Sequence, residues 1–173
     1  ALAILKIARM GHPLLMRVAD PIEDPSAPEV RPLALDMIDT MRDAPGIGLA
    51  APQVHIPLRM VIYYVPEGRD EEGEGHPLTI LINPEITVLD PALETGAEGC
   101  LSLPGMVGSV PRPQHIAVKA FDLDGQVQEY EAMGYHARVI QHECDHLDGI
   151  IYPMRMTDLS SLGYVEEMTG HDE

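Results

Sequence analysis

Sixteen prolines are spread along the 173-residue chain and constrain its fold more than any other residue type. They separate the segments of periodic hydrophobicity and do not gather in one tract, so they divide the chain into short elements and form no linker. The sequence contains no internal repeat and no visible domain boundary. A chain near this length buries roughly 68–70% of its unfolded surface, enough for one sizeable core. We therefore predict a single domain over residues 1–173, with an acidic tail from about residue 159 that is free to be flexible.

Two segments have the periodicity of helices. In the first, Ser26 stands three residues before Glu29, the spacing of a capping box, and apolar residues then recur at helical spacing as far as Pro-Gly at 45–46. We expect Ser26 to cap this helix and one face of the helix to be buried. The second helix is predicted from about residue 135 to residue 148, where Gly149 is placed as its left-handed terminator.

Strand patterns fill much of the remaining chain. They cover residues 60–65, 79–82, 115–121 and 126–130. Asp124-Gly125 separates the last two and is the strongest short hairpin signal. Because strands follow strands and the helices lie near the two ends of the strand region, the order favours an α+β fold with antiparallel sheet. Residues 66–77, dense in Glu and Gly, are predicted to form a solvated surface loop.

The chain is strongly acidic, with 11 Lys plus Arg, 28 Asp plus Glu and a formal net charge of −17. Binding of nucleic-acid phosphates needs a basic face, so this charge argues against DNA binding. The apolar runs are too short to span a bilayer, and no secretory pattern is visible. Two cysteines are too few for a disulfide framework. We therefore expect a cytoplasmic protein with free thiols and no membrane partner; an organellar origin stays open.

His142, Glu143 and His146 form an H-E-x-x-H pattern within the second predicted helix. Side chains four residues apart project from one face of a helix, so the two imidazoles can meet at one metal ion. Glu143 lies about 100° round the helix from His142, where it is poorly aimed as a third ligand but can take a proton from a metal-bound water. This arrangement is typical of metal-dependent hydrolases. Two histidines that merely pack or form hydrogen bonds on a helix would give the same short pattern.

A catalytic metal site needs a third protein ligand and an open position, and the residues offer three candidates. A metzincin would need a histidine where this chain has Tyr152, so that pattern fails. Glu166 lies at the spacing of zinc metallopeptidases with a glutamate ligand, which leaves His142, His146 and Glu166 as an alternative ligand set. Cys100 stands in a glycine- and proline-containing stretch that bends the backbone and can present a thiolate.

Three motifs, taken together, resemble the peptide deformylase family over nearly all of the chain, to about residue 158. They are GIGLAAPQ at 46–53, EGCLS at 98–102 and QHECDHLDG at 141–149, in the family's order. The resemblance implies antiparallel β-sheets packed around a central helix that bears the H-E-x-x-H pattern. It also implies N-terminal processing in protein biosynthesis, in which a metal-dependent hydrolase removes the N-formyl group from the N-terminal methionine of newly made polypeptides.

The resemblance further implies one divalent metal per chain, held by Cys100, His142 and His146. In this family the metal in the cell is usually Fe²⁺, and Zn²⁺, Ni²⁺ or Co²⁺ can replace it. The ligand set of one thiolate and two imidazoles does not by itself separate Fe²⁺ from Zn²⁺. The implied substrates are N-formyl-methionyl nascent peptides, and the ribosome is an implied partner.

The family also implies roles for residues around the metal. Glu143 acts as general base and then acid, while the Gln53 side-chain amide and the Leu101 backbone N–H donate to the oxygen that becomes negative. Arg112 is expected to pair with Asp145 behind the metal ligands. The implied substrate-binding residues are Gly46, Ile47, Gly48, Tyr135, Arg138 and Val139.

The chain departs from the family's pattern at several positions. Val107 stands where many members carry Arg, so one contact to the substrate backbone is in doubt. Arg138 replaces an apolar pocket residue of common bacterial forms. With Tyr135, Ala137 and the motif at 141–149, it makes this helix resemble the organellar and related bacterial branch. The acidic tail is poorly suited to binding ribosomal RNA. Docking to the ribosome is therefore the family property that this sequence supports least.

Overall fold

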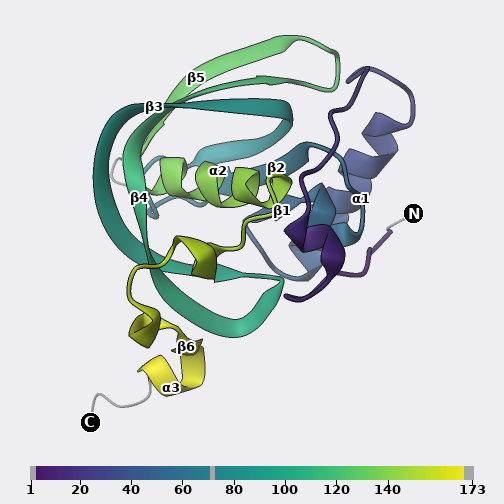
Figure 1. Cartoon of the computed structure of the whole chain (residues 1–173). Helices are drawn as coiled ribbons and strands as arrows, with labels where there is room; N and C mark the ends of the chain where they lie inside the picture. Colours follow the sequence, from purple (N-terminus) through teal and green to yellow (C-terminus); the bar gives the residue numbers. More distant parts are fainter. Residues whose placement is uncertain (1–2, 71–72, 170–173) are drawn as a thin grey trace.

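The strands form an antiparallel sheet that curves around a buried helix (Figure 1). The computed structural model describes residues 3–70 and 73–169, and within them the strand order is β1-β2-β3-β4-β5, with β6 paired to β4. The helix inside the curved sheet is α2, Gly134–Leu147, which carries the H-E-x-x-H pattern. The predicted α+β fold is therefore confirmed. The strands are β1 (Gly48–Ala50), β2 (Met60–Val65), β3 (His76–Cys100), β4 (Leu103–Phe121), β5 (Val127–Met133) and β6 (Gly163–Tyr164).

Strands β3 and β4 are much longer than the segments 79–82 and 115–121 that the sequence pattern predicts. The pattern is interrupted by prolines, which lack the N–H that a strand ladder needs. In the structure, the register between β3 and β4 shifts around Pro84 and again around Pro91, so the pairing continues past both residues. Much of β3 beyond β2 also has a neighbour on one side, and such an edge tolerates proline.

Helix α1, Val30–Asp43, begins later than predicted. Ser26 does not cap it, because the Ser26 backbone N–H and hydroxyl both donate to the Asp24 carboxylate, at 3.0 and 2.7 Å. The residue before a proline is disfavoured in the helical conformation, so Ala27 and Pro28 form a turn that precedes the helix. The prediction that the helix begins at Ser26 was therefore wrong.

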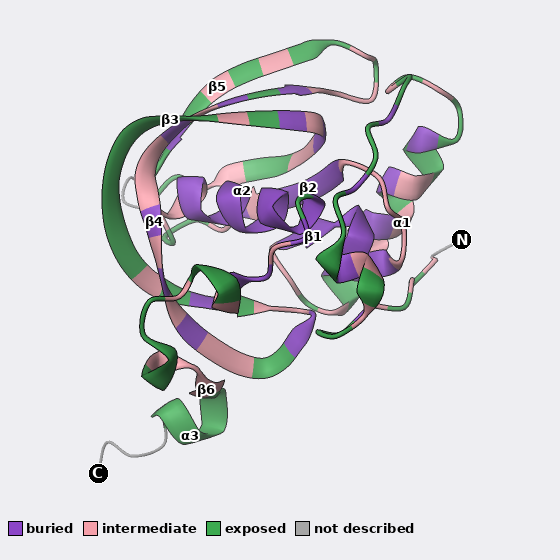
Figure 2. Ribbon diagram, in the orientation of Figure 1, coloured by how far each residue is buried: buried purple, intermediate pink, exposed green. Residues whose placement is uncertain are grey.

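Helix α2 agrees with its prediction and is the most buried element of the fold. Every residue from Ala137 to Leu147 is buried, and Figure 2 shows the helix in purple inside the ring of strands. Gly149 has a φ of 75°, the left-handed conformation predicted for the terminator. Side chains of β2, β4 and β5 pack against α2, and a second apolar cluster joins α1 to the other face of β2. The H-E-x-x-H pattern is thus carried on a helix that is buried from Ala137 to Leu147.

The two acidic segments behave differently. The acidic insert, residues 66–77, is a mostly exposed loop over its described residues 66–70 and 73–75, as predicted, but residues 76 and 77 belong to β3. The acidic tail expected from about residue 159 contains η4 (Leu159–Ser161), β6 and α3 (Val165–Thr169), and β6 pairs with β4 at Met106 and Val107. Residues 170–173 lie outside the described residues.

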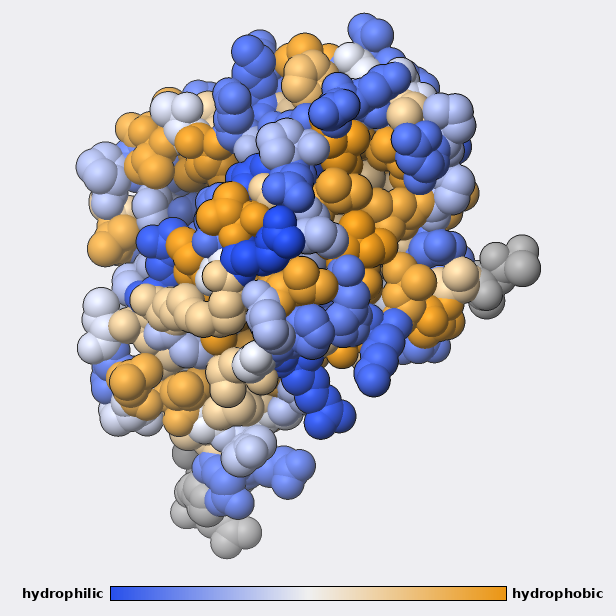
Figure 3. Space-filling model, turned by 45° about the vertical axis from the view of Figure 1, so that its right-hand side comes forward, coloured by the Kyte–Doolittle hydropathy of each residue, from blue (hydrophilic) through white to orange (hydrophobic). Residues whose placement is uncertain are grey.

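The surface is mixed in character. In the view of Figure 3, hydrophilic side chains are interspersed with hydrophobic ones over the visible face. Neither α2 nor any other helix in the described part of the chain combines the length and the apolar character needed to cross a membrane.

A polar cluster joins β2, β5, the start of β3 and the first turn of α2. The Tyr63 hydroxyl lies 2.5 Å from the Tyr130 hydroxyl and 2.9 Å from His136 Nε2. The His76 ring lies against His136, with 4.3 Å between ring centroids. Burial lowers the pKa of His136 to about 4; the charge of His76 adds to the shift, and Asp70 opposes it. The folded protein therefore keeps His136 neutral at pH values where a free histidine takes up a proton.

This shift predicts a pH-dependent loss of stability that a His136→Gln variant lacks. As the pH falls from 6.5, the ordinary pKa of histidine, towards 4, the unfolded chain binds a proton that the folded His136 resists. We expect the wild type to lose about 1–2 kcal/mol more than the variant over this window, after allowance for the solvent screening of a partly exposed ring. Chemical denaturation at a series of pH values measures the difference, and parallel profiles for the two proteins would contradict it.

Candidate metal centre

Cys100, His142 and His146 converge from two elements of the fold. The two histidines lie one turn apart on α2, with 5.3 Å between ring centroids, and Cys100 is the last residue of β3. The Cys100 Sγ atom is 3.4 Å from His146 Nε2, and one ligand atom of each residue lies within 4.8 Å of the others. No other group of three His, Cys, Asp or Glu residues in the described chain comes this close.

These three residues fit a divalent transition metal. One thiolate and two imidazoles suit Fe²⁺ or Zn²⁺, and three protein ligands leave a coordination position open for chemistry. Glu143 lies beside them with its Oε1 atom buried and without a hydrogen-bond partner among the described residues. Burial raises the pKa of Glu143 to about 7; the charge of Glu98 adds to the shift, and His142 and Arg112 oppose it. A buried, unpartnered carboxyl beside an open site is suited to proton transfer.

Glu98 orients the candidate ligand His142. The Glu98 Oε1 atom lies 2.7 Å from His142 Nδ1, which leaves His142 Nε2 as the nitrogen available to a metal. Burial alone would raise the pKa of Glu98, but hydrogen bonds from His142 and Arg112 outweigh it and lower the value to about 2. The residue analysis missed Glu98 as a site residue. Its place two residues before Cys100, where a carboxylate can reach a ligating histidine, was the available signal.

Two buried arginines hold the Glu98 carboxylate in place. Arg112 donates to both Glu98 oxygens, at 2.6 and 2.9 Å, and to Asp145 at 2.8 Å, so the predicted Arg112–Asp145 pair is present. Arg155 also donates to Asp145, at 3.0 and 3.2 Å. Arg138 donates to Glu98 Oε2 at 2.7 Å and to the carbonyl oxygens of Val110 and Glu94, at 2.7 and 2.8 Å. The charges behind the candidate metal centre are therefore paired and hydrogen-bonded, as buried charges must be.

The guanidinium group of Arg138 is thus held by Glu98 and two carbonyl oxygens. Arg138 is 8% exposed. A Cβ atom on Gly96 would lie 3.0 Å from the Arg138 guanidinium carbon, so the arginine reaches across from α2 to β3 where glycine makes room. The predicted substrate-binding residue therefore also supports the carboxylate that orients His142.

Replacing Arg138 with Met tests this support. We expect the variant to bind Zn²⁺ about tenfold more weakly than the wild type, because loss of a group behind a metal ligand typically lowers affinity by about 10–100-fold. Competition with a chromophoric chelator measures the dissociation constant. Arg31→Met is the matched control, since it removes the same charge from an exposed ion pair with Asp124. Equal affinities in the two variants would rule out a supporting role for Arg138.

The Gln53 side-chain amide is fixed beside Cys100. Gln53 is 1% exposed, and its Oε1 atom accepts the Ala50 N–H at 3.0 Å. Its Nε2 atom donates to the Ser102 hydroxyl at 3.1 Å and lies 3.5 Å from Cys100 Sγ. Leu101 follows Cys100 in the turn between β3 and β4. Both predicted donors therefore lie next to Cys100, and Ser102 is a further site residue that the sequence analysis did not predict.

The candidate metal centre opens into a cavity of about 790 Å³. Gly48 allows close approach at its wall, because a Cβ atom there would collide with the Glu143 carboxylate. Arg69 of the insert and Val165 of α3 also reach the cavity, and neither was anticipated. All six predicted substrate-binding residues line it: Gly46, Ile47, Gly48, Tyr135, Arg138 and Val139.

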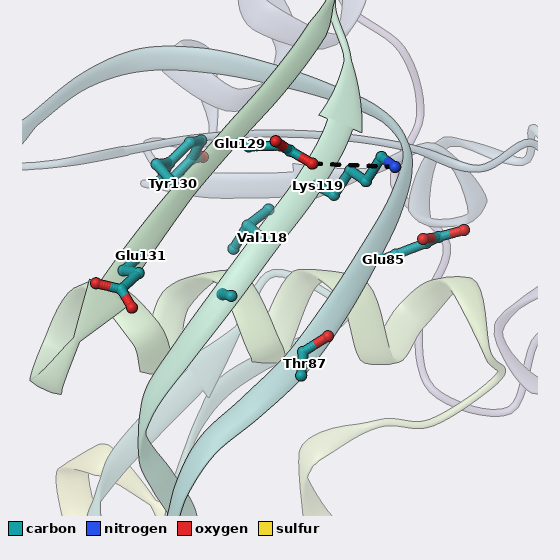
Figure 4. A pocket seen from close by; sticks show the side chains of 8 residues that line it. Glu85, Thr87, Val118, Lys119, Glu129, Tyr130 and Glu131 are labelled. Atoms are coloured by element: carbon teal, nitrogen blue, oxygen red, sulfur yellow. Dashed lines mark ion pairs between the residues drawn. The ribbon is translucent and has the colours of Figure 1, made fainter.

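Two other features of the surface, Glu166 on α3 and a second pocket, do not belong to the candidate metal centre. Glu166 lies on α3, is exposed, and is absent from the converging group, so the alternative ligand set of His142, His146 and Glu166 is wrong. A shallow pocket over β3, β4 and β5 is lined by charged side chains, among them Lys119 and Glu129, whose ion pair spans 3.9 Å (Figure 4). Among its described lining residues there is no imidazole or thiol.

The fold and the site define a metal-dependent hydrolase, and comparison with known proteins agrees. The sequence profile of the polypeptide deformylase family matches residues 4–161. Peptide deformylase 1 of Bordetella pertussis is 50% identical over 161 residues, covering 92% of each chain. Peptide deformylase 2 of Pseudomonas syringae pv. tomato is 48% identical over 168 residues, covering 95% of this chain and 94% of the relative.

Solved structures give the same result. The Met-Ala-Ser-bound class I type b peptide deformylase of Acinetobacter baumannii superposes with a TM-score of 0.83 at 34% identity, covering 90% of this chain and 100% of that one. The chain therefore belongs to the polypeptide deformylase family. Its activity is the metal-dependent removal of the N-formyl group from the N-terminal methionine of newly made polypeptides.

Proposed function

We propose that Cys100, His142 and His146 hold the metal of this deformylase and that Glu143 is its general base and acid. The observation that carries the proposal is the convergence of the three ligand atoms beside the buried Glu143 carboxyl. When bound, a divalent metal lowers the pKa of a coordinated water towards neutrality and polarises the formyl oxygen.

Each proton transfer falls to Glu143. It takes a proton from the water that attacks the formyl carbon and returns a proton to the methionine nitrogen as the carbon–nitrogen bond breaks. The products are formate and a free amino terminus. Negative charge develops on the former carbonyl oxygen, and donors that are already in position stabilise it without reorganisation. We assign this function to the Gln53 Nε2–H and the Leu101 backbone N–H, which flank Cys100.

The cavity is suited to an extended peptide. Residues 46–48 before and within β1 line one part of it and residues 97–99 of β3 another, so backbone groups of two segments face the substrate. Tyr135, Val139 and the stem of Arg138 offer a largely apolar surface for the methionine side chain. The A. baumannii relative was solved with Met-Ala-Ser bound, which supports the binding of a short peptide by this chain.

Replacing Glu143 with Gln tests the proposed proton transfer. We expect Glu143→Gln to lower kcat for formyl-Met-Ala peptides by about 10²–10⁴-fold, because a positioned general base contributes that much. Metal content should stay at one per chain, since Glu143 is not a ligand. Formate release and metal analysis on the same sample measure both. A variant with wild-type kcat would contradict the role of Glu143.

A pair of ligand variants tests the metal site itself. Cys100→Ala should lose the metal, because two imidazoles remain of the three ligands. Glu166→Gln, which removes the carboxylate of the rejected ligand set, should bind metal like the wild type. If Cys100→Ala kept its metal and Glu166→Gln lost it, the Cys100 thiolate would not be a ligand.

We also propose that the metal in the cell is Fe²⁺. The soft thiolate and two imidazoles suit it, and a ferrous centre with a thiolate ligand is sensitive to oxygen. We expect protein prepared in air to lose activity unless Zn²⁺, Ni²⁺ or Co²⁺ fills the site, and anaerobic protein to retain iron. Full retention of iron and activity after prolonged exposure to peroxide would contradict this assignment.

We place the enzyme in the bacterial cytoplasm, where formylated chains leave the ribosome. Its charge of −17 opposes a tight contact with ribosomal RNA, so we propose that it meets nascent chains by diffusion.

A further inference from the structure

The N-terminal segment, residues 5–10, crosses the two loops that carry the proposed oxyanion donors. The Ala8 N–H donates to the Gln53 carbonyl at 2.7 Å, and the Met10 N–H donates to the Ser102 carbonyl at 2.8 Å. Before them, the Leu5 N–H donates to the Thr40 hydroxyl of α1 at 2.8 Å. The chain thus joins α1, the loop of Gln53 and the turn after Cys100 in succession.

We propose that residues 8–10 are a positioning element of the catalytic site, which sets the spacing of the Gln53 amide and the Leu101 N–H. This inference rests on the proposed roles of those two donors. Ala8 and Met10 act through the loops that they hold and do not themselves touch the reacting atoms.

The spacing of the two hydrogen bonds explains how the segment acts. The two donors, Ala8 and Met10, are two residues apart, so the chain between them spans at most about 7 Å. The segment therefore holds the Gln53 carbonyl and the Ser102 carbonyl at one fixed separation. Gln53 and Ser102 are 49 residues apart in the sequence, and the Gln53 Nε2 atom joins the two segments directly through the Ser102 hydroxyl at 3.1 Å and Cys100 Sγ at 3.5 Å. Their relative placement depends on contacts of this kind and not on chain connectivity.

The residues that accept these bonds are buried, since Gln53 is 1% exposed and Ser102 0%. Of the two donors, Ala8 is 2% exposed and Met10 is 53% exposed, so the Ala8 bond is the better shielded from water. Ile7, between the anchors at Leu5 and Ala8, lines the catalytic cavity. The segment is consequently part of the wall of the site and cannot shift without moving the groups around it.

Hydrogen bonds therefore fix both the backbone and the side chain of Gln53. Its backbone carbonyl accepts from Ala8, and its side-chain Oε1 accepts from Ala50 at 3.0 Å. The remaining freedom of the Nε2–H group is small, which is the condition for stabilising an oxyanion without reorganisation. Loss of the hydrogen bond from the Ala8 N–H to the Gln53 carbonyl would allow the Gln53 side-chain amide to move. A misplacement of about 1 Å can lower a rate by about 10²-fold.

Replacing single backbone amides with esters removes these donors and leaves every side chain unchanged. We expect an ester at Ala8, or at Met10, to lower kcat for formyl-Met-Ala peptides by about 10–100-fold, with KM within about threefold. An ester at Leu5, whose N–H binds Thr40 away from the site, is the matched control and should retain kcat. Metal content and the free energy of unfolding are measured for all three. Equal kcat in the Ala8, Met10 and Leu5 esters would overturn the proposal.

A double-mutant cycle with Gln53→Ala separates positioning from a general loss of stability. If Ala8 acts through the Gln53 amide, its ester should change kcat by less than about twofold in the Gln53→Ala background. An equal fold-loss of kcat on introducing the Ala8 ester into the wild type and into Gln53→Ala would overturn the inference. It would leave the proposed role of Gln53 intact. Should Gln53→Ala itself keep wild-type kcat, the proposed function of that amide fails instead. If the Ala8 ester does not fold, the Met10 ester with a Leu101 ester provides the same cycle for the second donor.

Discussion

The carboxylate of Glu98 is the interaction on which the rest of the site depends. It accepts hydrogen bonds from the candidate ligand His142 on α2, from Arg112 on β4 and from Arg138 on α2. These contacts tie the helix that carries two candidate metal ligands to the strand that ends in the third, Cys100. A buried carboxylate is stable there because its charge is fully paired. Removing Arg138 would leave Arg112 and His142 as the partners of Glu98 and would take away one of the links between α2 and β3.

The electrostatics of the interior differ from those of the surface. The whole chain has a net charge of −17, whereas the region behind the metal centre contains the buried arginines Arg112 and Arg138. They balance Glu98 and Asp145, with Arg155 added at the edge. The acidic composition is therefore a property of the solvated face. It affects encounters with other molecules, and it says little about the chemistry inside.

Several features could be predicted because they depend on local pattern. The spacing of His142 and His146 on a helix determines that both face one way, and Asp124-Gly125 predicts the hairpin between β4 and β5. Predictions failed where a competing local interaction, or pairing with a distant strand, outweighed the pattern on which they rested. Ser26 has the spacing of a cap, yet Asp24 satisfies it and Pro28 delays the helix. Strands β3 and β4 continue past their prolines because the ladder can shift its register there.

The sequence by itself determined the α+β class, the helix with its H-E-x-x-H pattern and the family motifs, since each of these is written in neighbouring residues. Only the tertiary structure shows that Cys100 lies beside the two histidines while Glu166 is exposed on α3, because the spacing of these residues along the chain does not place β3 against α2. It also decided that Arg138 reaches Glu98 and that residues 8–10 bridge the loops of Gln53 and Ser102. The physical reason is that hydrogen bonds between segments far apart in the chain depend on the packing of the whole fold, which no local pattern encodes.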